Sequence, residues 1–359
     1  MPHIIFRCLL LVSVFLPALV MPVWAAGSGL PQETVIVYSW PDYMPEGLLD
    51  DFTRETGIKV NYSTYNNNEI MYTKLKLLKG RGYDVLVPST YMVEKLRNEG
   101  LLQPIKKKLL SHYDQLDGAL LNKSFDPKNE FSVPYLWGSV GLGINKNNAL
   151  AAGATSWADL WNRHWQDKLL LLDDMRSVFA IALRLDGHSP NATAPEDIKR
   201  AYERLQTLMP NVHLFKSDKP RETFLKGEVE FGTLWSGDAV LAQTQNPAIQ
   251  YIYPKEGAAF WMDNFVIPAR ASNPDNAHQF IDYMLRPEVA ARCVKANSYG
   301  TPNLGARKLL EDAIKNNPII FPPAEVLEKA EFQRDVGDAM ELYLDYWEKL
   351  KALGEKKSS

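Results

Sequence analysis

The chain has 359 residues, of which 46% are hydrophobic and 23% are charged, so it can form one large or two medium domains and is not expected to be disordered. The formal net charge is only −3. The basic residues are scattered, apart from Lys106, Lys107 and Lys108, so the composition gives no support for nucleic acid as a partner.

The N-terminus has the pattern of a secretory signal peptide. Arg7 precedes an apolar run over residues 8–20, and Val23 and Ala25 stand at positions −3 and −1 of a cleavage site. We therefore expect residues 1–25 to be cleaved after Ala25. The alternative is a membrane anchor, which the short length of the run disfavours. Cys293 is then the one cysteine left, so we expect an exported protein stabilised by its core, with Cys293 buried in it.

The next hundred residues alternate between strand and helix patterns. Apolar, β-rich or alternating runs predict strands at 34–39, 58–65 and 83–89. Helical spacing with Pro and Gly at its ends predicts helices at 45–57, 69–80 and 91–100. This alternation predicts a parallel sheet covered on both faces.

The pattern then recurs farther along the chain. We predict strands at 168–174 and 228–235, helices at 175–185 and 195–209, and an amphipathic terminal helix at 335–353. Two apolar segments, 132–146 and 259–269, are expected to cross between the units. The sequence thus predicts two α/β units rather than one long sheet. The first lobe would comprise 26–135 plus 262–305, and the second 136–261 plus 306–359.

Aromatic rings and carboxylates recur at the ends of the predicted strands, where open α/β sheets bind ligands. These residues are Trp40, Asp42, Tyr43, Ser89, Tyr91, Asp173, Asp174, Trp235, Asp238, Trp261 and Asp263. Some of these residues have simpler explanations. Asp173 or Asp174 could cap the next helix, and Asp173 is favoured. Asp238 could cap the helix that follows the strand at 228–235. The glycine cluster at 138–143 lies inside an apolar crossing, so it is weak as a phosphate site, and the histidines lack zinc spacing.

Carboxylates among aromatic rings suit a cation with apolar length. Each charge-assisted hydrogen bond contributes about 1.5–3 kcal/mol, and each cation–π contact roughly 0.5–2 kcal/mol. In a strand, Trp261 and Asp263 project from one face, and a buried carboxylate there needs a positive partner from the protein or from a ligand. A bound sugar is the rival interpretation. A glycoside hydrolase with Asp42 and Asp263 as its acid and base is a weaker one.

Several stretches resemble the periplasmic spermidine/putrescine-binding proteins, the substrate-binding components of polyamine ABC transporters. They are "YSWPDYMP", "SWADLW", "LLLLDDMRSVFAIAL", "YPKEG", "FWMD" and "YGTPNLGARKLL", and the similarity runs in order from about residue 34 to about 350. The resemblance implies a two-lobed α/β periplasmic binding protein fold with crossing hinge strands and a ligand cleft between the lobes. It also implies a monomeric periplasmic protein that binds a polyamine, is not an enzyme and uses no cofactor or metal.

The resemblance also implies roles for particular residues. Trp40, Tyr43, Trp235, Trp261 and Tyr299 would line the methylenes of the ligand. Asp42, Asp174 and Asp263 would hold its nitrogens, so the positive partner of Asp263 would be a ligand ammonium group. Further contacts would come from Ser89, Tyr91, Ser217 and Gln333.

Two positions depart from the family pattern. Ser177 stands where spermidine-binding members carry Glu, and Pro41 stands where relatives carry Thr or Ser. Asp238 instead resembles the putrescine-binding branch. This mixed site leaves two membrane partners open: a polyamine ABC permease or, as in the NspS-type norspermidine-sensor branch, a membrane-bound cyclic-di-GMP enzyme with a periplasmic sensor domain.

Overall fold

The computed structural model describes residues 33–355, so the predicted signal peptide and its cleavage site lie outside the described residues. The strands are β1 (Thr34–Ser39), β2 (Lys59–Thr64), β3 (Val85–Leu86), β4 (Ser132–Asn145), β5 (Leu169–Leu171), β6 (Val212–Phe215), β7 (Phe231–Trp235), β8 (Ile249–Ile252) and β9 (Ala259–Val266). The α-helices are α1 (Leu48–Thr56), α2 (Asn68–Leu77), α3 (Thr90–Asn98), α4 (Ala149–Ala152), α5 (Met175–Leu185), α6 (Pro195–Leu208), α7 (Arg221–Leu225), α8 (Ser236–Gln245), α9 (Pro274–Met284), α10 (Pro287–Asn297), α11 (Leu304–Leu309), α12 (Asp312–Lys315), α13 (Ala324–Leu327) and α14 (Ala339–Glu355). Short 3-10 helices lie at Lys107–Leu109, Tyr113–Gln115, Gly118–Leu120, Trp157–Trp161, Arg163–Trp165 and Met209–Asn211.

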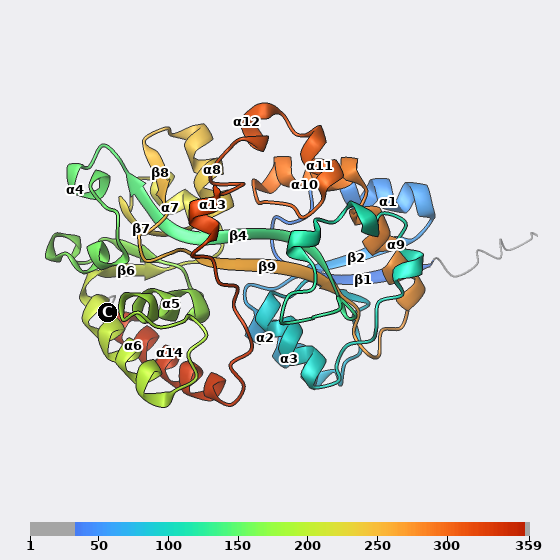
Figure 1. Cartoon of the computed structure of the whole chain (residues 1–359), viewed down its shortest axis with the longest axis horizontal. Helices are drawn as coiled ribbons and strands as arrows, with labels where there is room; N and C mark the ends of the chain where they lie inside the picture. Colours follow the sequence, from blue (N-terminus) through green and yellow to red (C-terminus); the bar gives the residue numbers. More distant parts are fainter. Residues whose placement is uncertain (1–32, 356–359) are drawn as a thin grey trace, which may run out of the picture. The chain divides into compact units, whose positions relative to one another are not determined.

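All described strands belong to one mixed sheet with the order β2-β1-β3-β9-β4-β7-β5-β6, and β8 pairs with β4. β1 runs parallel to β2 and β3, and β5 runs parallel to β6 and β7. These two parallel groups match the two predicted α/β units. Helices cover both faces of each group, with α1 and α9 on one side of β1 and β2 and α2 and α3 on the other (Figure 1).

The long strands β4 and β9 join the two groups. They pair antiparallel from Ser132–Val266 to Val140–Ala259 and run side by side through the middle of Figure 1. β9 also pairs with β3, and β4 also pairs with β7, so the hydrogen bonding continues from one group to the other. The prediction that the two units do not share one long sheet was therefore wrong, because the crossing segments are strands that join both units into a single sheet.

The third predicted strand, 83–89, is much shorter in the structure. Only Val85 and Leu86 are strand. The side chain of Asp84 accepts hydrogen bonds from the backbone N–H groups of Ile36 (2.9 Å) and Asn273 (2.7 Å), so a carboxylate replaces part of the backbone ladder. Pro88 has no N–H to donate, which interrupts the ladder, although its carbonyl still accepts a 2.9 Å hydrogen bond from the Asn264 N–H of β9.

Packing explains the glycine cluster of β4. An added Cβ would lie 2.6 Å from the Trp261 ring at Gly138, 2.6 Å from Tyr251 at Gly141 and 2.5 Å from Leu234 at Gly143. Large side chains of the neighbouring strands thus cross directly over this strand. The interpretation of this segment as an apolar crossing, rather than a phosphate-binding loop, is confirmed by its place in β4.

The helices agree with their predicted positions. Within the described chain, α14 is the only long helix after residue 305. α1 ends at Gly57, which adopts a left-handed conformation (φ 75°) and donates its N–H to the carbonyl of Thr53. Cys293 is fully buried on α10, as predicted for a core thiol. Within residues 33–355, no helix is both long and apolar enough to cross a membrane.

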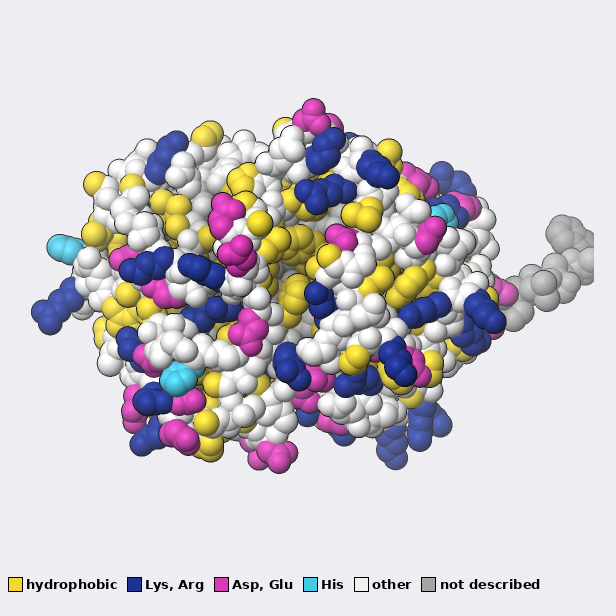
Figure 2. All heavy atoms as spheres, viewed as in Figure 1, with side chains coloured by type: hydrophobic (Ala, Val, Ile, Leu, Met, Phe, Trp, Pro, Cys, Tyr) yellow, Lys and Arg dark blue, Asp and Glu magenta, His cyan; other side chains and the backbone are white. Residues whose placement is uncertain are grey.

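Charges of both signs are interspersed over the face shown in Figure 2, in agreement with the small net charge of the sequence. Apolar atoms are visible at the centre of this face. This face therefore shows no surface patch of one charge, and the candidate site is a cavity.

Candidate ligand-binding site

One cavity of about 370 Å³ brings together all the predicted site residues except Tyr91. The predicted residues that line it are Trp40, Asp42, Tyr43, Ser89, Asp174, Ser217, Trp235, Asp238, Trp261, Asp263, Tyr299 and Gln333. Pro41 and Ser177, the two departures from the family pattern, line it as well. The residues converge because most of them follow the carboxyl ends of β1, β3, β5, β6 and β7. Their role in ligand binding stays a prediction.

Asp263 is a buried carboxylate on β9, with 2% of its surface exposed. Its Oδ1 accepts a 2.6 Å hydrogen bond from the Ser89 hydroxyl, and its Oδ2 accepts one from the Tyr43 hydroxyl. Burial raises the pKa of Asp263 to about 7, although both hydrogen bonds act to lower it. Among the residues the structure describes, no lysine or arginine lies within 4.0 Å of this carboxyl.

Ser89 is itself held by a residue that the sequence analysis missed. The side chain of Asn68 donates to the Ser89 hydroxyl (3.2 Å) and accepts from the Ser89 backbone N–H (3.3 Å). Asn68 is the first residue of α2 and lines the cavity. The only feature of the sequence that could have identified Asn68 was its position one residue before the helix predicted at 69–80.

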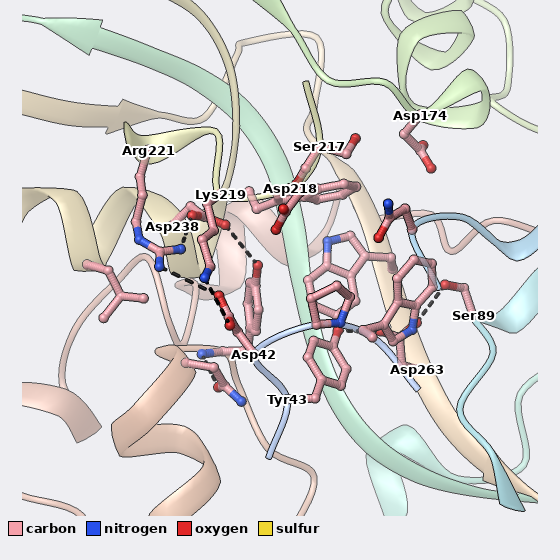
Figure 3. Close-up of a pocket in the computed structure, with 18 of the residues that line it drawn as sticks. Asp42, Tyr43, Ser89, Asp174, Ser217, Asp218, Lys219, Arg221, Asp238 and Asp263 are labelled. Carbon is pink, nitrogen blue, oxygen red and sulfur yellow. Dashed lines mark hydrogen bonds and ion pairs between the residues drawn. The ribbon is translucent and has the colours of Figure 1, made fainter. Parts of the chain in front are cut away.

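Aromatic rings form the middle of the cavity (Figure 3). The centroid of Trp261 lies 6.1 Å from that of Trp235 and 4.8 Å from that of Tyr299, both at nearly right angles. Tyr43 lies 6.1 Å from Tyr299 and 6.5 Å from Trp40. These rings offer faces to ammonium groups and apolar surface to methylenes. The indole Nε1 of Trp261 is buried without a hydrogen-bond partner in the described chain.

Asp174 caps helix α5, which corrects the preference for Asp173 as the cap. The Asp174 Oδ1 accepts a 2.8 Å hydrogen bond from the Ser177 backbone N–H. Burial raises the pKa of Asp174, and this hydrogen bond acts against that rise. Asp174 nevertheless lines the cavity, so one carboxylate both caps a helix and faces the site.

Asp238 lies in the first turn of α8 but does not cap it, because the cap position is Trp235. Its Oδ1 accepts a 2.5 Å hydrogen bond from Arg221, so this acid has a basic partner within the protein. Arg221 and Lys219 also pair with Asp42, at 3.7 and 3.5 Å. Neither base was predicted from the sequence. Both closely follow Ser217, beyond the end of β6, and this position near a strand end was the signal that could have identified them.

Ser217 and Gln333 complete the lining. The Ser217 hydroxyl is buried without a partner in the described chain, and its carbonyl accepts a 3.1 Å hydrogen bond from the indole of Trp235. Gln333 is 5% exposed, and its backbone carbonyl accepts a 2.5 Å hydrogen bond from Thr90. A free hydroxyl at a cavity wall is a hydrogen-bonding group available to a ligand.

Tyr91 is the predicted residue that the cavity does not include. Its hydroxyl donates a 2.8 Å hydrogen bond to Glu69, and the guanidinium of Arg176 packs 5.1 Å from its ring centroid. Tyr91 lies in the first turn of α3, two residues after Ser89, and is 2% exposed. Its hydroxyl is thus satisfied by Glu69 in this structure, and its contact with a ligand stays a prediction.

The cavity therefore combines an apolar aromatic middle with carboxylates around it. Its lining includes the acids Asp42, Glu46, Asp174, Asp218, Asp238 and Asp263 and the bases Lys219 and Arg221. Such a lining suits a small cation with apolar segments. Within residues 33–355, no group of three or more His, Cys, Asp or Glu residues is arranged to hold a metal ion.

Known proteins resemble this chain in sequence and in fold. Residues 47–322 match the bacterial extracellular solute-binding protein family. The spermidine/putrescine-binding periplasmic protein of Escherichia coli (strain K12) is 47% identical over 319 residues, covering 89% of this chain and 92% of that protein. The putrescine-binding periplasmic protein PotF of the same organism is 33% identical over 317 residues, covering 83% and 85%.

A solved structure of a putative spermidine/putrescine ABC transporter protein from Listeria monocytogenes superposes with a TM-score of 0.85. It is 33% identical and covers 89% of this chain and 99% of that one. The chain thus belongs to the bacterial extracellular solute-binding proteins. Its fold is the two-lobed α/β fold of the periplasmic binding proteins, with β4 and β9 as the crossing strands, and its family consists of binding proteins rather than enzymes.

Proposed function

We propose that this protein binds a linear polyamine of the spermidine or norspermidine class in the periplasm. The ligand lies in the cavity, the two lobes close on it, and a membrane partner receives the ligand or recognises the closed form. The names of relatives that are 47% identical support the ligand class and the periplasmic location.

One observation carries the proposal: the buried carboxylate of Asp263 has two hydrogen-bond donors but no basic partner in the described chain. A buried acid without a counter-charge is costly, and an ammonium group at this place would remove that cost. Trp261, two residues away on the same strand, is placed to pack against the adjoining methylenes. A neutral sugar would leave Asp263 without its counter-charge.

The test is calorimetric titration of residues 26–359, unfolded and refolded first to remove bound ligand. The ligands are putrescine, norspermidine, spermidine, spermine and one neutral disaccharide. We expect tight one-to-one binding of a triamine and no binding of the disaccharide. Disaccharide binding without polyamine binding would overturn the proposal.

Two membrane partners are compatible with this function. A polyamine ABC permease is supported by the solved relatives, which are described as proteins of spermidine/putrescine ABC transporters. A membrane-bound cyclic-di-GMP enzyme with a periplasmic sensor domain is supported by Ser177 and Pro41, which alter the cavity lining relative to the spermidine-binding pattern. Deletion of the gene distinguishes them: loss of spermidine uptake indicates the permease, whereas a changed cyclic-di-GMP response to added norspermidine with unchanged uptake indicates the sensor.

A further inference from the structure

Four charged side chains gather at one end of the cavity and form what we call the acid–base cluster: Asp42, Lys219, Arg221 and Asp238. Arg221 bonds Asp238 at 2.5 Å and lies 3.7 Å from Asp42, while Lys219 lies 3.5 Å from Asp42. Figure 3 shows these four together, with Asp263, Ser89 and Asp174 on the opposite side of the aromatic rings.

The acid–base cluster has no net formal charge, and part of it is shielded from solvent. It holds two acids and two bases, and the side chains of Arg221 and Asp238 are 18% and 9% exposed. Tyr299 lies between this end and the middle of the cavity, with its hydroxyl 3.5 Å from the Asp238 Oδ2. The charge of Asp238 is therefore already met by a protein cation before any ligand enters.

The other end of the cavity lacks such cations. Asp263 is hydrogen-bonded only by hydroxyl groups, and Asp174 by a backbone N–H. Neither has an ion pair with a lysine or arginine within the described chain. Ammonium groups of a ligand thus meet carboxyl groups that have no basic partner at the Asp263 end and a fixed guanidinium at the Asp238 end.

We propose that Arg221 determines ligand specificity by occupying the Asp238 end of the cavity as an internal cation, so that polyamines long enough to place an ammonium group there are disfavoured. A like charge beside the guanidinium is repelled, and Asp238 can be released only by breaking its bond to Arg221. The cavity then selects di- and triamines over tetraamines. This inference rests on the proposed polyamine-binding function and assigns to Arg221 a role in discriminating between ligands.

The test compares spermidine with spermine by calorimetry on wild type, Arg221→Gln and Arg221→Lys. Arg221→Gln leaves Asp238 without its cation, and we expect the affinity for spermine relative to spermidine to rise by about tenfold or more. Arg221→Lys keeps the charge and should keep the wild-type ratio. The double variant Arg221→Gln, Asp238→Asn opens the same space without a free carboxylate, so it should not show the gain.

An unchanged ratio in Arg221→Gln, or an equal gain in the double variant, would overturn the proposal. Should Arg221→Gln fail to fold, Asp238→Asn alone tests it, because the unmatched guanidinium should then weaken spermine binding several-fold more than spermidine binding, and an unchanged ratio would count against it. Failure of wild type to bind any polyamine would refute the proposed function itself, a result distinct from an unchanged ratio.

Discussion

Ser89 and Asp263 are 174 residues apart in sequence, yet the hydroxyl of the first donates a 2.6 Å hydrogen bond to the carboxylate of the second. The two residues also form an isolated antiparallel bridge beside β9. This contact fixes the orientation of the buried acid on which the proposed function depends.

Asp263→Asn should weaken triamine binding by about 2–5 kcal/mol, as removal of one partner of a buried charge pair does. The amide keeps the shape of the side chain but cannot pair with an ammonium group. Calorimetry with spermidine measures the loss. Asp275→Asn is the matched control, because Asp275 is an exposed acid on α9 paired with Lys106, and it should bind as wild type does. A loss below tenfold in Asp263→Asn would make Asp263 peripheral.

Ligand affinity should rise with pH. In the free protein the pKa of Asp263 is about 7, and an ammonium group binds only the ionised form, so affinity should increase about tenfold between pH 6 and pH 8. Spermidine titrations in buffers of different ionisation enthalpy should show proton release below pH 7. If spermidine affinity did not change with pH, in wild type as in Asp263→Asn, ionisation of Asp263 would not control ligand binding.

The same shift has the opposite effect on the stability of the ligand-free protein. Folded Asp263 keeps its proton up to about pH 7, whereas the unfolded side chain loses it near the ordinary value of 3.8. The folded state thus binds more protons in this window, and the contribution of Asp263 to the free energy of unfolding falls as the pH rises from about 4 to 7. Urea unfolding should show a shallower decline for Asp263→Asn than for wild type.

Asp42 connects the loop after β1 to Lys219, just before α7, and to Arg221, the first residue of that helix. If this contact holds the closed form, Asp42→Asn should weaken apparent spermidine affinity by only about 0.5–1 kcal/mol at low salt, because the Asp42 side chain is half exposed. Small-angle scattering should show that wild type contracts on adding spermidine and that the variant needs more ligand to do so. Identical scattering with and without saturating ligand would argue against closure.

Gly138→Ala should damage both the fold and the site, because the new Cβ would lie 2.6 Å from the Trp261 ring and 2.8 Å from the Ser236 hydroxyl. We expect about 1–3 kcal/mol of lost stability and weaker spermidine binding as the indole is displaced. Urea unfolding and calorimetry measure the two effects. Gly118→Ala has open space at its Cβ and should change neither.

The sequence predicted the elements well where periodicity was long and apolar. The same holds for the residues at strand ends, because the carboxyl ends of parallel strands must meet at one edge. It did not predict the single sheet, because the pairing of β4 with β9 joins segments more than a hundred residues apart. The partner of Asp238 was missed for a similar reason, since Arg221 is 17 residues away and only the fold brings them together.

Local geometry explains two smaller differences between the predicted and the observed positions of side chains. Asp173 and Asp174 are equally suited to capping by residue type, and only the backbone turn decides that Asp174 bonds the Ser177 N–H. Tyr91 and Ser89 are two residues apart, but the helix that begins at Thr90 directs the tyrosine to Glu69 instead of the cavity.

Strand β9 has a consequence for how the occupancy of the cavity is communicated. It carries Trp261 and Asp263, and it is also hydrogen-bonded to β3 on one side and to β4 on the other. In the proposed function, an ammonium group paired with Asp263 would therefore act directly on the hydrogen-bonded strands that join both halves of the sheet, with no loop between. The same strand thus carries proposed ligand contacts and holds the two halves of the sheet together. We therefore expect a substitution in β9 that alters ligand affinity to alter the rigidity of the sheet as well.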